Sequence, residues 1–235
     1  MIINTALNLE SIRIIAQALG DLHNRVVYVG GAVVSLYIND PAAEDVRPTK
    51  DIDIGLEITT LGELENLRDE LVRKNFRQSP EETVICRFKY NDITVDIMST
   101  KEVGWLPANP WFGPGFKHLE QQKIENITIH ILPLAYFLAS KFTAFHNRGA
   151  KDPRTSQDFE DITYILDNRI DIVEVILQSP DDVKKYLKAE FQEILNNTVL
   201  QESILGNLTY LTQTQRFTMM MDKLKKIVHG NEHTQ

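Results

Sequence analysis

The chain has 235 residues, of which 43% are hydrophobic and 25% are charged. This composition is ordinary for a globular protein, and the length suffices for one large domain or two closely packed ones. The formal net charge of −8 argues against a dedicated nucleic-acid coat or a binder of anionic membranes, since both need basic surface.

Three sequence features bear on the compartment. No apolar run approaches the length of a membrane span, and the first residues lack the basic region and hydrophobic core of a secretory signal. Cys86 is the only cysteine, which excludes an internal disulfide framework and fits a reducing compartment. The histidines are scattered without a zinc-binding spacing. We expect a cytoplasmic protein that does not contact a membrane.

The N-terminal part is organised around a glycine loop. A helix is predicted over residues 9–19, and a short apolar run typical of a buried strand follows at residues 26–29. Gly30 and Gly31 come next, and residues 32–38 are predicted to form a helix. A glycine pair between a strand and a helix lets backbone N–H groups approach an anionic ligand at the positive end of the helix.

The second predicted strand, over residues 51–57, follows a polar surface loop. It carries Asp51 and Asp53, whose side chains leave the same face, while the isoleucines beside them point into the core. Neighbouring carboxylates repel each other unless a cation lies between them. Mg²⁺ prefers oxygen ligands and is often held by one or two carboxylates together with substrate phosphates. The pattern therefore predicts a site that handles a nucleotide and a divalent cation.

The next segment adds a helix, two strands and a third carboxylate. Thr60 and Glu63 form a capping box that predicts the start of a helix. Two strands follow, at residues 83–90 and 93–98, joined by a tight hairpin turn. In the second of them Asp96 alternates with apolar residues. We expect Asp96 to share a sheet and a polar face with the two earlier aspartates, so that three carboxylates converge.

The pattern changes near residue 132. Residues 105–115 hold both tryptophans and three prolines and are predicted to be an ordered loop, and a further hairpin is predicted before residue 132. Pro133 suits the first turn of a helix, and almost everything after it has a helical period. We predict an α+β fold, with a mixed sheet flanked by helices in a domain of residues 1–132 and an all-helical domain of residues 133–235.

The glycine pair, the Asp-x-Asp strand and the later lone aspartate together resemble the nucleotidyltransferase superfamily typified by DNA polymerase β. The resemblance implies a nucleotidyltransferase-like sheet in which Gly30 and Gly31 contact the triphosphate of an NTP. It implies that Asp51 and Asp53 ligate two Mg²⁺ ions. Asp96 would complete the metal site and assist deprotonation of the attacking hydroxyl.

Within that superfamily, the sequence Arg47-Pro-Thr-Lys-Asp-Ile-Asp is similar to the RxSxDxD pattern of AbiEii-type, MenA-like toxins. The stretch from Lys141 to Arg148 and the later Asp158-Phe-Glu-Asp161 extend the similarity. The resemblance implies that Lys141 grips the NTP phosphates and that Asp158 or Asp161 belongs to the site. Arg47 either braces the aspartates or contacts the nucleotide.

Several alternatives stay open at this point. Lys141 can extend its stem to solvent, Asp158 can be a charge at a helix N-terminus, and Asp161 can pair with a nearby arginine. The family's Gly-Gly-Thr/Ser is Gly-Gly-Ala32 in this chain, and its Arg-Asp pair is Gln157-Asp158. The glycine loop also resembles CCA-adding tRNA nucleotidyltransferases, but the Arg-Asp pair that follows there is Val-Ser in this chain.

The resemblance implies transfer of a nucleoside monophosphate from an NTP to a hydroxyl on a tRNA end or a protein. It also implies a toxin–antitoxin or phage-defence setting, with a cognate antitoxin as a partner. Two alternatives to this function stay open. One is a nucleotidyltransferase acting on a small molecule such as an antibiotic. The other is a catalytically silent, antitoxin-like or regulatory binding module of the same fold.

Overall fold

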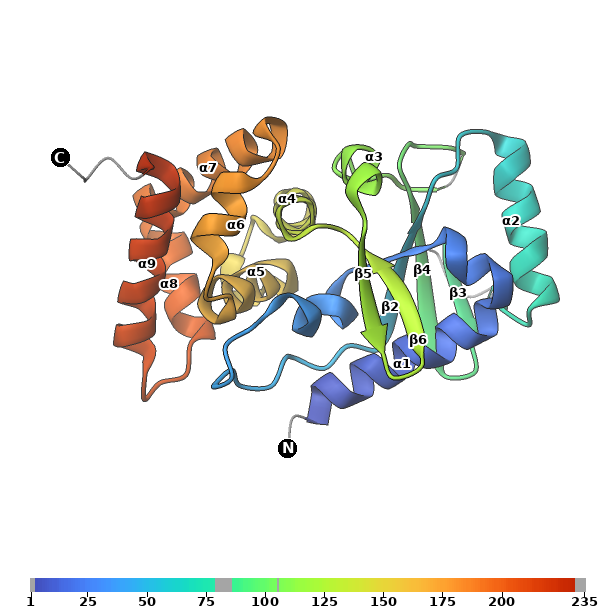
Figure 1. The fold of residues 1–235 in the computed structure, drawn as a ribbon, viewed down its shortest axis with the longest axis horizontal. Helices are drawn as coiled ribbons and strands as arrows, with labels where there is room; N and C mark the ends of the chain where they lie inside the picture. The colour runs from blue at the N-terminus through green and yellow to red at the C-terminus, as the bar shows by residue number, and fades with distance from the viewer. Residues whose placement is uncertain (1–2, 79–85, 105, 231–235) are drawn as a thin grey trace. The chain divides into compact units, whose positions relative to one another are not determined.

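The computed structural model describes residues 3–78, 86–104 and 106–230 (Figure 1). The chain forms two compact units: residues 1–36 with 44–133, and residues 37–43 with 134–235. The short segment 37–43 thus groups with the helices near the C-terminus, although the chain on both sides of it groups with the sheet. In the part of the chain that is described, no helix is long and apolar enough to cross a membrane.

The first unit is built on a mixed six-stranded sheet with the strand order β3-β4-β2-β1-β6-β5 (Figure 1). Its strands are β1 (Val27–Val29), β2 (Asp51–Leu56), β3 (Arg87–Tyr90), β4 (Ile93–Ser99), β5 (Glu120–Ile124) and β6 (Ile127–Ile131). The central strand β1 pairs antiparallel with β2 and parallel with β6, and β2 pairs parallel with β4. The two predicted hairpins are confirmed as β3–β4 and β5–β6, with Asn91 and Glu125 at positive φ in their turns.

Helices and short turns complete the first unit. They are α1 (Ile3–Leu19), η1 (Gly20–Arg25), η2 (Gly31–Tyr37, whose last residue groups with the second unit), α2 (Leu61–Arg73), α3 (Phe112–Gly115) and η3 (Phe116–His118). Helix α1 packs against β2 and β6 and buries Ile12, Ile15 and Leu19 completely. Helix α2 begins with the predicted capping box, in which Thr60 and Glu63 bond each other's backbone N–H.

The structure modifies three of the predicted elements. The segment 32–38 is predicted as an ordinary helix, but residues 32–37 belong to the 3₁₀ helix η2, where Ala32, Val33 and Val34 are all buried. The adjacent β-branched valines and the shortness of the segment both disfavour a regular α-helix. The predicted loop at 105–115 contains the short helix α3, and its Trp105 lies outside the described residues. The predicted strand at 83–90 is described from Cys86 onward, as β3 from Arg87.

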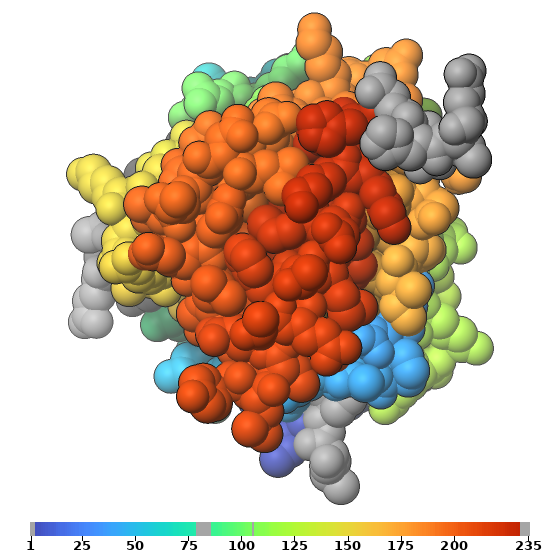
Figure 2. Space-filling view, turned by 90° about the vertical axis from the view of Figure 1, so that its left-hand side faces the viewer, coloured from blue at the N-terminus to red at the C-terminus, as the bar shows by residue number. Residues whose placement is uncertain are grey.

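The second unit is helical. It contains α4 (Leu134–Ala144), the π-helical turn η4 (Phe145–Gly149), η5 (Pro153–Thr155), α5 (Gln157–Asn168), α6 (Ile172–Gln178), α7 (Asp181–Asn196), α8 (Thr198–Asn207) and α9 (Gln213–His229). Its core includes an edge-on contact between Phe142 and Phe191 and a close contact between Phe145 and Phe159. Figure 2 shows, in orange to red, the surface that the last helices of this unit form. The sheet and the helices after it confirm the predicted α+β class.

Candidate active site

The glycine loop after β1 is shaped by a close approach of the backbone to two side chains. Gly30 has a φ of 72°, which L side chains rarely adopt, and a Cβ there would collide with the carboxylate of Asp53. A Cβ on Gly31 would press on the guanidinium of Arg47. Gly30 is therefore required by its backbone conformation and by this contact, and the loop backbone lies directly against an acidic and a basic side chain.

The carboxylates of β2 and β4 lie on one face of the sheet, as their spacing predicts. The buried residues of β2 alternate with Asp51 and Asp53, and Ile52 and Ile54 on the opposite face are 2% and 0% exposed. The parallel register places Asp53 directly beside Asp96 of β4. Two carboxylates on neighbouring strands and a third two residues away thus share a surface next to the glycine loop.

An arginine that the sequence analysis did not single out faces these carboxylates. Arg87 of β3 lies opposite Asp96 in the antiparallel register. Its Nε and Nη2 donate to Oδ1 and Oδ2 of Asp96, each at 2.7 Å, and Nη2 lies 3.9 Å from Oδ2 of Asp51. The signal for this pair was present in the sequence, because a two-residue turn at Asn91 and Asp92 sets residue 87 opposite residue 96.

The donor set of this face suits a hard divalent cation. Carboxylate oxygens are the ligands that Mg²⁺ prefers, and the missing side chain of Gly30 is what lets the loop backbone approach Asp53. Within the described ranges, no three acidic, histidine or cysteine side chains are grouped closely enough to hold a metal ion as they stand. The three carboxylates share one face, and both oxygens of Asp96 are bonded to Arg87.

The second unit holds a separate cluster of predicted residues. Nζ of Lys141, on α4, donates to Asp161 at 2.6 Å and to Asp158 at 3.2 Å, both on α5. Arg148 of the π-helical turn donates to both oxygens of Asp158, at 2.7 and 2.9 Å. Lys141 is 5% exposed and each aspartate is 2% exposed. Lys141 and the two aspartates are thus buried, Arg148 reaches Asp158 from the surface, and Lys141 does not extend to solvent.

The electrostatics of Asp158 follow from these contacts. Burial alone raises the pKa of its carboxyl group. The hydrogen bonds from Arg148 and the positive charge of Lys141 outweigh burial, so the pKa of Asp158 lies below its ordinary value. The π-helical turn that carries Arg148 packs closely against the start of α5, which carries Asp158. A Cβ at Gly149 of this turn would collide with Ser156.

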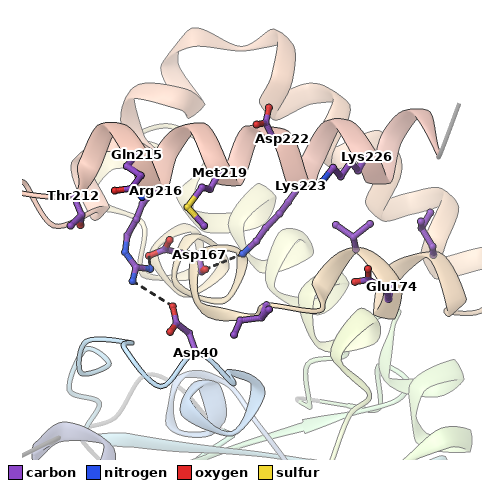
Figure 3. A pocket seen from close by; sticks show the side chains of 13 residues that line it. Asp40, Asp167, Glu174, Thr212, Gln215, Arg216, Met219, Asp222, Lys223 and Lys226 are labelled. Atoms are coloured by element: carbon purple, nitrogen blue, oxygen red, sulfur yellow. Dashed lines mark hydrogen bonds and ion pairs between the residues drawn. The ribbon is translucent and has the colours of Figure 1, made fainter. Parts of the chain in front are cut away.

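The second unit also has a concave surface between α6 and α9, with a volume of about 780 Å³ (Figure 3). Two basic residues that line it, Arg216 and Lys223, have partners within the unit. Arg216 pairs with Asp167 at 2.9 Å and Asp40 at 3.4 Å, and Lys223 donates to three backbone carbonyls at the end of α5. These contacts fasten α9 and the segment 37–43 to the end of α5. We therefore interpret Arg216, Lys223 and the two aspartates that pair with Arg216 as structural.

A mixed sheet with a glycine loop after its central strand and an Asp-x-Asp strand beside it is the arrangement of a nucleotidyltransferase. The chain belongs to the AbiEii family, described as nucleotidyl transferase AbiEii toxin of a type IV toxin–antitoxin system, which matches residues 13–228. It is therefore a nucleotidyltransferase, a transferase of phosphorus-containing groups.

Two solved structures are similar to the chain. The antibiotic-resistance factor ANT(2'')-Ia, solved in solution, shares 13% identity over 80% of this chain and 92% of its own, with a TM-score of 0.47. An antigenic nucleotidyltransferase-like protein from Paracoccidioides brasiliensis shares 16% identity over 93% of this chain and 92% of its own, with a TM-score of 0.48. No curated protein matches the sequence.

Proposed function

We propose that the chain transfers a nucleoside monophosphate from an NTP to a hydroxyl group, with Mg²⁺ as the cation. The observation that carries this proposal is the packing of the Gly30 backbone against Asp53, with Asp96 beside it in register. A loop backbone that approaches a carboxylate so closely puts a phosphate-binding element next to cation ligands. Family membership supports the reaction type.

In this proposal the residues of the first unit have distinct tasks. The backbone of Gly30 and Gly31 binds the triphosphate, and Arg47, against Gly31, adds positive charge there. Asp51, Asp53 and Asp96 would hold two Mg²⁺ ions. When bound, these would neutralise the charge of the triphosphate and stabilise the entering and leaving oxygens.

The reaction balances without a further reactant. The acceptor oxygen forms a bond to the α-phosphorus, and the bond from that phosphorus to the bridging oxygen of the β-phosphate breaks. The electron pair of the broken bond leaves with pyrophosphate. Asp96 takes the proton of the acceptor hydroxyl as a general base.

The family resemblance implies that Lys141 grips the NTP phosphates and that Asp158 or Asp161 belongs to the site, and we include these residues in the proposal on that ground. The buried ion pairs give this cluster a structural task as well. The variants K141R and K141M separate the two tasks, because arginine keeps the positive charge with a different side-chain shape, whereas methionine keeps a similar shape without the charge.

The acceptor we propose is a tRNA end or a protein side chain, in a toxin–antitoxin setting with a cognate antitoxin. The family description, which names a toxin of a type IV system, supports this setting. The assay supplies each NTP, radiolabelled at the α-phosphate, with Mg²⁺ and with total tRNA, cell lysate or the protein alone. Label in RNA or protein would name the base and the acceptor class.

The control for this assay is the double variant D51N/D53N, matched by D69N on the exposed face of α2. We expect the label to vanish in the double variant and to persist in D69N. Folded wild-type protein that labels neither RNA nor protein would contradict the proposed acceptor. That result would favour a small-molecule acceptor or a silent binding module.

A further inference from the structure

Arg87 is placed by the fold to act as a counter-ion for the carboxylate face. Strand β3 is anchored by Phe88, which is fully buried, and its register with β4 sets Arg87 opposite Asp96. The bidentate pair has both N···O distances at 2.7 Å, and the two side chains are only 27% and 19% exposed. Such fork-to-carboxylate pairs are among the stronger hydrogen bonds in proteins.

The same guanidinium also serves a second carboxylate. Nη2 of Arg87 lies 3.9 Å from Asp51, so one positive charge is shared between β2 and β4. Its positive charge reduces the repulsion between Asp51 and Asp96 on this face. Arg87 thus takes the electrostatic place that a divalent cation would take.

We infer that Arg87 is a resident counter-ion of Asp96 and competes with the divalent cation for this carboxylate. The inference rests on the proposed function, because it takes Asp96 as a cation ligand. Arg87 is a positioning residue: its two hydrogen bonds hold the carboxylate of Asp96 in one orientation in the cation-free protein. Because both oxygens of Asp96 are occupied, the cation affinity of the nucleotide-free protein is low. Phosphate oxygens of an NTP supply the further ligands that overcome this competition.

The test measures binding of Mn²⁺, used as the probe, by the paramagnetic resonance signal of the free ion. The variants are R87A, R87K and the matched control K89A. Lys89 lies two residues along β3, is exposed and faces Thr94, so its removal changes the net charge equally without touching Asp96. Thermal unfolding of the cation-free proteins is recorded in parallel.

We expect R87A to bind Mn²⁺ at least about tenfold more tightly than wild type in the absence of nucleotide, since a charged hydrogen bond no longer competes. R87K should fall between the two, because an ammonium cannot form the bidentate pair. Cation-free R87A should unfold at a lower temperature, and Mn²⁺ should raise that temperature more than in wild type. K89A should match wild type in Mn²⁺ affinity.

Unchanged or weaker Mn²⁺ binding by R87A, with wild-type protein binding the ion, would overturn the inference and leave the proposed function intact. Absence of Mn²⁺ binding by wild type and R87A, with and without NTP, would overturn the cation part of the proposed function and the inference with it. If R87A does not fold, R87K decides: equal affinity in R87K and wild type would overturn the inference.

Discussion

Replacing Lys141 with methionine tests whether the buried cluster of the second unit holds α4 to α5. Methionine keeps an unbranched, apolar stem of similar length, so the change removes chiefly the charge. Lys141 donates to Asp161 at 2.6 Å and to Asp158 at 3.2 Å, and all three side chains are nearly inaccessible to solvent. Solvent screening therefore weakens these pairs very little.

The magnitude follows from what the variant leaves behind. Removing one partner of a buried ion pair costs about 3–5 kcal/mol of unfolding free energy. Arg148 continues to bond both oxygens of Asp158, so we expect the lower end, about 3 kcal/mol. In a protein of this size this corresponds to a melting temperature lower by about 6–12 °C.

The assay is chemical and thermal unfolding followed by circular dichroism at neutral pH. The double variant K141M/D161N should regain much of the loss, because removing both partners leaves no unpaired buried charge. K185M, on an exposed position of α7, is the matched control and should stay within about 0.5 kcal/mol of wild type. A loss below about 1 kcal/mol in K141M would refute the structural role that burial implies.

Further predictions follow from other contacts. G30A should lower the unfolding free energy by about 1–3 kcal/mol and the transfer activity about a hundredfold, because a Cβ at positive φ collides with Asp53. The control G62A lies in open space on α2 and should leave the unfolding free energy and the activity nearly unchanged. Equal activity in the two variants would contradict the close approach. The pKa of Asp158 is lower in the folded protein than its ordinary value. The contribution of this carboxylate to the unfolding free energy is therefore complete above the ordinary pKa of a carboxyl group, and it is lost as the pH falls through the pKa of the folded state. D158N should therefore flatten the acid limb of a plot of unfolding free energy against pH, and an unchanged slope would show that the network does not act in this way. D45A should cost about 1 kcal/mol in urea unfolding, because this carboxylate caps the first turn of α1, and a neutral result would exclude the cap.

Much of the first unit was predictable because its signals are local. Alternating burial in β2 places Asp51 and Asp53 on one face, and two-residue turns fix the hairpin registers. The capping box at Thr60 required only a spacing of three residues. These features depend on backbone periodicity and turn chemistry, which the sequence displays directly.

Other features depend on contacts between distant segments. Asp45 caps α1 from 41 residues away, a relationship that no periodicity reveals. The sequence left Asp161 with a possible arginine partner, whereas in the structure it bonds Lys141 and Arg148 bonds Asp158. That outcome follows from the packing of α4, the π-helical turn and α5. The pair of Arg87 and Asp96 lies between these two cases, because the register of the hairpin alone predicts that the two residues face each other.

The central claim is transfer of a nucleoside monophosphate by the carboxylate face beside the glycine loop. The most direct test compares the fate of NTP labelled at the α-phosphate with that of NTP labelled at the γ-phosphate, in wild type and in D53N. We expect that the α-label enters the acceptor, that the γ-label leaves as pyrophosphate, and that both outcomes disappear in D53N. Transfer of the γ-label to the acceptor, or activity that survives in D53N, would contradict it.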